Sequence, residues 1–137
     1  MRRARVGVVP YSPVGRGFLT GNVAALRDLE ESDFRRGLPQ FQGENLERNL
    51  ALAQRVQGLA TTLGVTPVQV ALAWLLAQHE HLVPIPGTKR VKYLEENAAA
   101  VDVHLTQDQL AEIASAIPGG AVSGDRYTEA GMAAVNR

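Results

Sequence analysis

The chain has 137 residues, of which 14 are basic and 14 are acidic, so its formal net charge is zero. A balanced charge argues against a nucleic-acid-binding protein held by a basic face, and 45% hydrophobic residues can fill a core, which excludes a disordered chain. The absence of cysteine excludes disulfides, thiolate metal sites and a cysteine nucleophile, and it fits a cytoplasmic protein.

The first predicted element is a short strand over residues 5–10, because three valines there precede a proline. Residues 11–17 contain one proline and two glycines, so we expect a loop, and a short helix follows within residues 22–31. A longer helix begins at Asn45, because apolar residues recur every three or four positions as far as Leu63.

A second long helix is expected directly after Gly64, a residue suited to the left-handed end of the first one. Thr66 is the predicted N-cap, Pro67 takes the first helical position, and Gln69 completes a capping box. Residues 68–77 are apolar nearly all round, so we expect burial on more than one side. No apolar stretch approaches the roughly 20 residues that span a bilayer, so we expect no membrane segment.

Residues 82–86 are the second predicted strand, and a helix over residues 90–100 follows with Val91 and Leu94 facing inward. A last helix starts after the N-cap Thr106. Two strands separated by helices favour parallel pairing in an α/β fold. Because two strands alone do not form a stable sheet, the sequence indicates a partial domain of a larger architecture.

A glycine-containing loop follows each predicted strand, over residues 11–17 and 86–89. Ligands of α/β proteins bind beyond the carboxyl ends of parallel strands. Lys89, Arg90 and Lys92 place three cations beside the second loop, where a helix start also favours an anion. This pattern is equally typical of a solvated basic helix start.

Two motifs resemble a known family. Residues 7–21 (GVVPYSPVGRGFLTG) closely resemble the seventh strand and loop of aldo-keto reductases, and residues 85–89 (IPGTK) with 94–97 (LEEN) resemble the eighth strand and its helix. Residues 41–46 and 72–75 are similar to bacterial members. The resemblance covers nearly the whole chain but only the C-terminal part of such an enzyme, which is normally more than twice as long.

The resemblance implies an α/β fold, namely the C-terminal portion of a (β/α)8 TIM barrel with two parallel strands, in which residues 1–137 are a single partial domain. It also implies that NADP is the cofactor, with Tyr11 matching the tyrosine that stacks on the nicotinamide ring. The other matches are Ser12, Val14, Gly15 and Arg16 for the pyrophosphate, Gly87, Thr88 and Lys89 for the adenosine 2′-phosphate, and Glu96 and Asn97 for the adenine and its ribose. Without the family, Tyr11 would more often be a packed loop aromatic, and Glu96 a carboxylate on a helix surface.

The chain departs from the family pattern at Tyr93, where many members carry an arginine that grips the 2′-phosphate. The charge for this phosphate must therefore come from Lys89, Arg90 or Lys92, and the preference for NADP over NAD depends on them. A lysine suits a phosphate as a point charge.

The catalytic residues of the family have no match in this chain. Aldo-keto reductases use a tyrosine acid with a lysine, an aspartate and a histidine, all from earlier strands, so we assign no catalytic residue. We assign no metal ligand either, because His79 and His81 lack the spacing that places two ligands on one helix face. The resemblance therefore implies a truncated NADP-dependent oxidoreductase that reduces small carbonyl compounds, aldehydes or ketones, to alcohols.

Three alternatives stay open for the chain itself. The first is an active reductase component that another chain completes. The second is a non-catalytic nucleotide-binding remnant. The third is the product of a truncated or mis-started reading frame. In the last case its open sheet edges would favour association with other chains.

Overall fold

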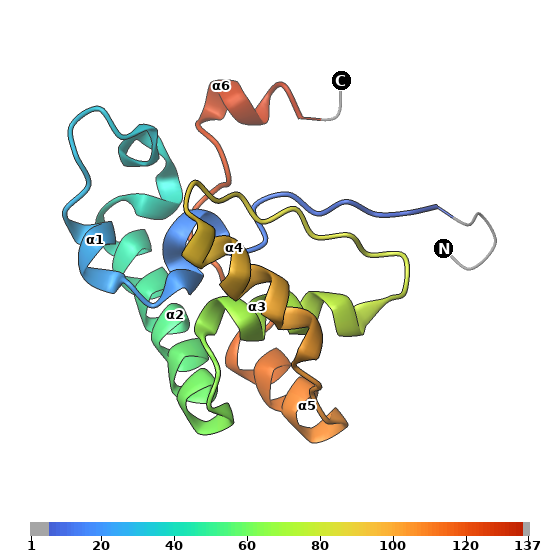
Figure 1. The fold of residues 1–137 in the computed structure, drawn as a ribbon. Coiled ribbons are helices and arrows are strands. Elements are labelled where there is room, and N and C mark those ends of the chain that lie inside the picture. The colour runs from blue at the N-terminus through green and yellow to red at the C-terminus, as the bar shows by residue number, and fades with distance from the viewer. Residues whose placement is uncertain (1–5, 136–137) are drawn as a thin grey trace.

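The computed structural model describes residues 6–135, and Figure 1 shows them as a largely helical chain. In chain order the elements are the 3-10 helix η1 (Gly15–Thr20), α1 (Val23–Arg27), the 3-10 helices η2 (Phe34–Gly37) and η3 (Pro39–Phe41), α2 (Gly43–Leu63), α3 (Pro67–Gln78), α4 (Val91–Ala98), the 3-10 helix η4 (Ala99–Asp102), α5 (Gln107–Ala116) and α6 (Glu129–Met132).

Helices α2 and α3 form the centre of the fold and lie at 90° to each other. Gly64 ends α2 with a φ of 69°, as its position predicted, because a glycine adopts this left-handed conformation without steric cost. Thr66 and Gln69 form the predicted capping box at the start of α3. The same box starts α5, where Thr106 pairs with Gln109.

Helix α3 is buried on more than one side, which confirms the prediction from its all-round apolar sequence. On one side Val70, which is fully buried, packs with Val56 of α2 and Ile113 of α5. On another side Leu72 packs with Ala100 of η4. These contacts fix α5 and η4 on α3.

A second core lies between η1, η3 and the first half of α2. The rings of Phe18 and Phe41 are 4.5 Å apart, and Leu50 packs in the same cluster with 1% of its surface exposed. This core fixes the loop that follows the first extended segment against α2.

The two predicted strands are not confirmed as a sheet. Residues 6–10 and 82–86 are extended and parallel, but they share a single bridge between Val8 and Leu82, closed by backbone hydrogen bonds of 2.8 and 2.9 Å. Prolines follow in both segments and lack the N–H group that a longer ladder needs, and within residues 6–135 no further strand pairs with either segment. Arg5, at which the first strand was expected to begin, lies outside the described residues.

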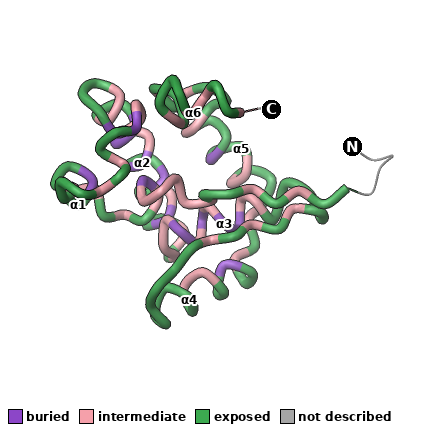
Figure 2. The backbone as a smooth tube through the Cα atoms, turned by 90° about the horizontal axis from the view of Figure 1, so that it is seen from above, coloured by how far each residue is buried: buried purple, intermediate pink, exposed green. Residues whose placement is uncertain are grey.

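The predicted inward face of α4 is wrong. Val91 exposes 70% of its surface and Leu94 56%, and Figure 2 shows α4 and the paired extended segments as mostly exposed or intermediate. The apolar spacing of α4 is therefore not satisfied by packing within the described chain.

No single helix within residues 6–135 has both the length and the apolar composition needed to cross a membrane, although the bent pair of α2 and α3 reaches that length and composition together.

Candidate functional site

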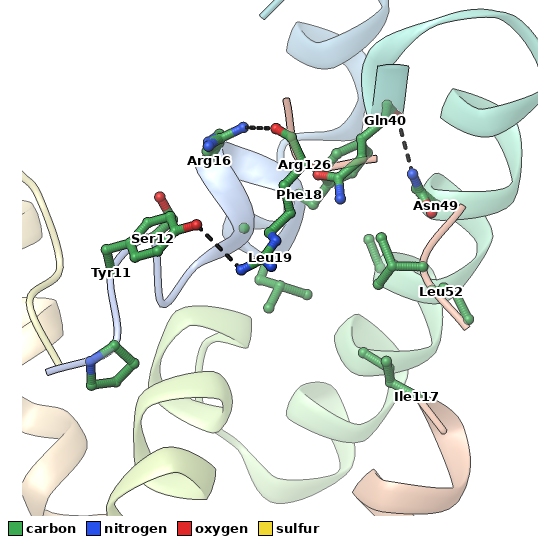
Figure 3. A pocket seen from close by; sticks show the side chains of 14 residues that line it. Tyr11, Ser12, Arg16, Phe18, Leu19, Gln40, Asn49, Leu52, Ile117 and Arg126 are labelled. Atoms are coloured by element: carbon green, nitrogen blue, oxygen red, sulfur yellow. Dashed lines mark hydrogen bonds between the residues drawn. The ribbon is translucent and has the colours of Figure 1, made fainter. Parts of the chain in front are cut away.

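Three cavities surround the loop that follows the first extended segment. The first, of about 450 Å³, lies between this loop, α2 and residues 117–126, and Figure 3 shows its side chains. The second, of about 320 Å³, lies between the same loop, α3 and α5. Tyr11 and Ser12 line both of them. The third is an open groove of about 670 Å³ between η1, η2 and residues 87–89.

The loop has an unusual backbone. Ser12 and Arg16 adopt left-handed conformations with φ of 50° and 54°, and Gly15 and Gly17 have φ of 61° and 111°. The Val14 carbonyl accepts hydrogen bonds from the N–H groups of Gly17 and Leu19, both at 3.2 Å. Non-glycine residues rarely adopt left-handed conformations, so the surrounding structure holds this loop.

The open groove joins the two loops that the sequence singled out. Arg16 lines it from η1, and Gly87 and Lys89 line it from the loop after the second extended segment. Asp33 and Arg35 form the opposite wall. Hydrogen bonds from Arg35 hold the pKa of the Asp33 carboxyl at about 2, so three cationic residues and one carboxylate line the groove. The excess of positive charge suits an anion.

The structure distinguishes the three cations of the second loop. All three are exposed, but Lys89 lines the groove together with Arg16, whereas Arg90 is the N-cap residue of α4 and Lys92 lies in its first turn. Tyr93, where the family resemblance expects an arginine, is 45% exposed. Of the three candidates for a phosphate contact, Lys89 is therefore the best placed.

Tyr11 and Arg16 are both held by the C-terminal segment. Arg16 Nη1 donates to the backbone carbonyl of Arg126 at 2.8 Å, and the Arg16 guanidinium lies 4.9 Å from the centroid of the Tyr127 ring. Arg126 Nη1 donates to the Tyr11 hydroxyl at 3.4 Å (Figure 3). A hydrogen bond from Tyr127 lowers the pKa of Tyr11, and Arg126 and Arg16 lower it further.

Asn49 fixes this segment on α2. Its side-chain amide pairs with both backbone groups of Ser123, accepting from the N–H at 2.8 Å and donating to the carbonyl at 2.9 Å. It also donates to the Gln40 carbonyl at 3.0 Å. The Ser123 hydroxyl bonds to the Asn45 side chain at 2.6 Å. With 3% of its surface exposed, Asn49 is a buried polar residue whose hydrogen bonds are satisfied.

The other predicted site residues are less closely grouped. Thr88 is exposed and accepts a hydrogen bond from the N–H of Arg90, and Arg90 is the N-cap residue of α4. Glu96 and Asn97 lie half-buried on α4, where the Glu96 carbonyl accepts from the Gln69 side chain at 3.3 Å. Neither residue lines the three cavities described above.

Sequence reasoning missed several residues of this site. Residues 32–43 contain two glycines and one proline with no clean period, and residues 125–137 carry no motif that points to a role, so Asp33, Arg35 and Arg126 were overlooked. One signal was available for Asn49, because it lies three residues after Leu46 on the apolar stripe of α2. A polar residue on such a stripe needs a buried partner, but the sequence does not show which one.

Metal chemistry has no obvious ligand set in the described part of the chain, since within residues 6–135 no group of three or more His, Asp or Glu side chains could hold an ion. His79 and His81 are both exposed, and their rings lie 5.0 Å apart.

Comparison with known proteins gives one family and several relatives. The family model described as "Aldo/keto reductase family" matches residues 1–118. The chain is 48% identical to "Aldo-keto reductase yakc [NADP(+)]" of Schizosaccharomyces pombe and 44% identical to "Probable aldo-keto reductase 1" of Glycine max, over 92% of this chain in both cases. It is 39% identical to "Aldo-keto reductase str7" of Strobilurus tenacellus over 95% of this chain. The alignments span 37%, 36% and 39% of the lengths of these relatives.

Proposed function

Because the chain belongs to the aldo/keto reductase family, we propose that it forms the cofactor-binding portion of an NADP-dependent oxidoreductase that reduces aldehydes or ketones. The family implies a (β/α)8 barrel, and in this proposal residues 1–137 are a single partial domain, the C-terminal portion of that barrel. The observation that carries the proposal is the open groove, which Arg16 lines from one loop and Lys89 from another.

The groove fits the phosphates of NADP by the chemistry of its donors. Arg16 offers a planar guanidinium that can pair with two oxygens of a phosphate, and Lys89 offers a point charge suited to a terminal phosphate. Gly87, beside Lys89, has open space where a Cβ would lie. We therefore assign Arg16 to the pyrophosphate and Gly87, Thr88 and Lys89 to the 2′-phosphate. The name of the Schizosaccharomyces pombe relative includes NADP(+), which supports NADP as the cofactor.

Tyr11 lines both of the first two cavities and is 48% exposed, so its side chain is accessible to a ligand. We assign it to the nicotinamide, whose chemistry is to carry a hydride. Ser12, Val14 and Gly15 complete the loop. Glu96 and Asn97 are assigned to the adenine and ribose on the family resemblance alone, because they lie apart from the groove.

The chemical step needs a proton donor beside the carbonyl group. The residues assigned above bind and orient the cofactor, and none of them matches the tyrosine acid of the family or the residues that tune it. A positioned acid contributes about 100- to 10,000-fold to such a rate. We therefore propose that the 137-residue chain by itself binds NADP without reducing carbonyl compounds. Its cytoplasmic location and its association through the exposed extended segments stay predictions.

Trp74 provides a direct test. It is the only tryptophan in the sequence, and it lines the same cavity as Tyr11. NADPH is added to the purified chain while energy transfer from Trp74 to the nicotinamide is followed, and a panel of aldehydes is then added. We expect saturable energy transfer that is weaker in Tyr11→Ala, and no loss of nicotinamide absorbance.

Two results would contradict the proposal in different ways. If no saturable binding of NADPH is found, the chain is not the cofactor-binding portion. If NADPH is oxidised in proportion to the protein concentration, and the activity is lost in Tyr11→Ala, the chain builds a complete active site.

A further inference from the structure

Arg16 has a backbone conformation that needs support from elsewhere in the molecule. Its φ of 54° and ψ of 29° are left-handed, a conformation that carries a steric cost for an L-residue. The conformation is nevertheless the one in which Arg16 lines the groove shared with Lys89. A group that stabilises it therefore also determines where the Arg16 charge lies.

Arg35 makes the contact that supports this conformation. Its Nη1 donates to the backbone carbonyl of Arg16 at 2.9 Å. The guanidinium also packs against the next residue, because a Cβ built on Gly17 would lie 2.9 Å from the same nitrogen. Arg35 thus contacts the loop on both sides of the Arg16–Gly17 peptide.

Arg35 is itself fixed on two sides. Its Nε and Nη2 donate to the two carboxylate oxygens of Asp33, with the shorter distance at 2.6 Å, and the Asp33 Oδ1 also accepts from the Arg35 backbone N–H at 2.9 Å. The guanidinium carbon lies 6.0 Å from the centroid of the buried Phe41 ring. Both side chains of the pair are about three-quarters buried, so the pair is more constrained than a solvated surface pair.

We infer that Asp33 and Arg35 are positioning residues, which hold the Arg16 loop in the conformation that binds a phosphate group of the cofactor. The inference rests on the proposed function, because NADP is the ligand that this loop would meet. Asp33 orients Arg35, and Arg35 holds the Arg16 carbonyl, so the loop keeps the conformation in which Arg16 lines the groove. A loop held in advance spends less binding free energy on ordering, so the pair raises affinity through the loop that it supports.

The loop itself can be tested without any ligand. The N–H groups of Gly17 and Leu19 both bond to the Val14 carbonyl directly across Arg16, and their exchange with solvent reports whether the turn is closed. We expect faster exchange at these two amides in Asp33→Asn and Arg35→Lys. The matched control is Glu47→Gln, which breaks a similar two-point pair with Arg27 away from the groove.

The NADPH affinity of the same variants then tests whether the loop conformation matters for cofactor binding. We expect Asp33→Asn and Arg35→Lys to weaken NADPH binding about tenfold, the smallest loss expected for one charge-assisted contact to a phosphate. Glu47→Gln should leave the affinity unchanged.

The outcomes separate the two proposals. Unchanged exchange at Gly17 and Leu19 in both variants would overturn the positioning role, whatever happens to NADPH. Faster exchange with unchanged NADPH affinity would overturn it as well, because the loop would then not matter for binding. Failure of the wild-type chain to bind NADPH would instead reject the proposed function, while the exchange experiment would still decide whether Asp33 and Arg35 hold the loop.

Discussion

Valines are buried in the helical centre of the molecule and exposed in the two paired extended segments. Val56 and Val70, in α2 and α3, expose 2% and 0% of their surface, whereas Val9 and Val83, in the extended segments, each expose 57%. All four are valines, so the difference lies in what surrounds them. The helices find their partners within the chain, and the extended segments bury little beyond their single bridge.

The comparison shows which interactions a helix and a strand need. A helix satisfies its backbone by itself and requires only one apolar face to be covered, which α2, α3 and α5 do for one another. A strand needs a neighbour on each side for its backbone. The chain supplies one such neighbour for each segment, and both outer edges stay open within residues 6–135.

The two valines give the largest predicted difference. Val70→Ala removes methyl groups from a fully buried site and should lower the free energy of unfolding by about 2–3 kcal/mol. Val83→Ala, the same change at an exposed site, should stay within about 0.5 kcal/mol. Urea denaturation midpoints measure both. Equal losses would mean that the extended segments are packed against something in solution.

Asn49→Ala tests a buried polar contact of the helical centre. The change leaves the backbone groups of Ser123 and the Gln40 carbonyl without their partner, and we expect a loss of about 1–2 kcal/mol. The C-terminal segment should also become sensitive to limited proteolysis. Asn45→Ala, which removes the bonds to the Ser123 hydroxyl and the Pro39 carbonyl at a less buried position, is the milder control, and an equally large effect there would contradict the role given to Asn49.

A smaller effect is expected at the start of α3. Thr66→Ala removes the side-chain acceptor for the Gln69 N–H and should cost about 1 kcal/mol. Thr62→Ala is the matched control, because Thr62 is exposed within α2 and bonds only to the Gly58 carbonyl in its own helix. Thermal unfolding of the two variants would distinguish a capping effect from a general loss of threonine.

The smallest change is expected on acidification. The pKa of Asp33 is lowered from 3.8 to about 2 by its hydrogen bonds with Arg35, so the folded state favours the charged form. Its contribution to stability is therefore fully present above about pH 4 and is lost as the pH falls towards 2. An NMR titration of the Asp33 carboxyl should give a midpoint near pH 2, and a midpoint near 3.8 would mean that the pair with Arg35 is not formed.

Local signals in the sequence predicted the helical part well. The periodicity of α2, the glycine at its end, the capping box of α3 and the N-cap of α5 all depend on residues within one or two turns of each other. The pairing of the extended segments was predicted in direction but not in extent, because extent depends on neighbours beyond the two segments. The inward face of α4 failed for the same reason, since Val91 and Leu94 have no covering surface in the described chain.

The residues of the candidate site also fall into those that the sequence could predict and those that it could not. Arg16 and Lys89 could be singled out because their loops carry recognisable glycine motifs next to predicted strands. Arg35 and Arg126 could not, because they contact Arg16 and Tyr11 across 19 and 115 positions, which no local pattern predicts. Asp33 could not either, because it acts through Arg35. The C-terminal segment that holds Tyr11 also lies largely beyond residues 1–118, which the family model matches.

The central claim is that Lys89 and Arg16 form one phosphate-binding groove, and the affinity of Lys89→Ala for two cofactors tests it most directly. NADPH and NADH differ only in the 2′-phosphate, and a charge-assisted contact to it is worth about 1.5–3 kcal/mol, or roughly 10- to 150-fold in affinity. Titration calorimetry should therefore show a loss of this size for NADPH and little change for NADH, while Lys92→Ala, an exposed lysine outside the groove, should change neither. Equal losses for both cofactors in Lys89→Ala, or an equal effect of Lys92→Ala, would contradict the assignment.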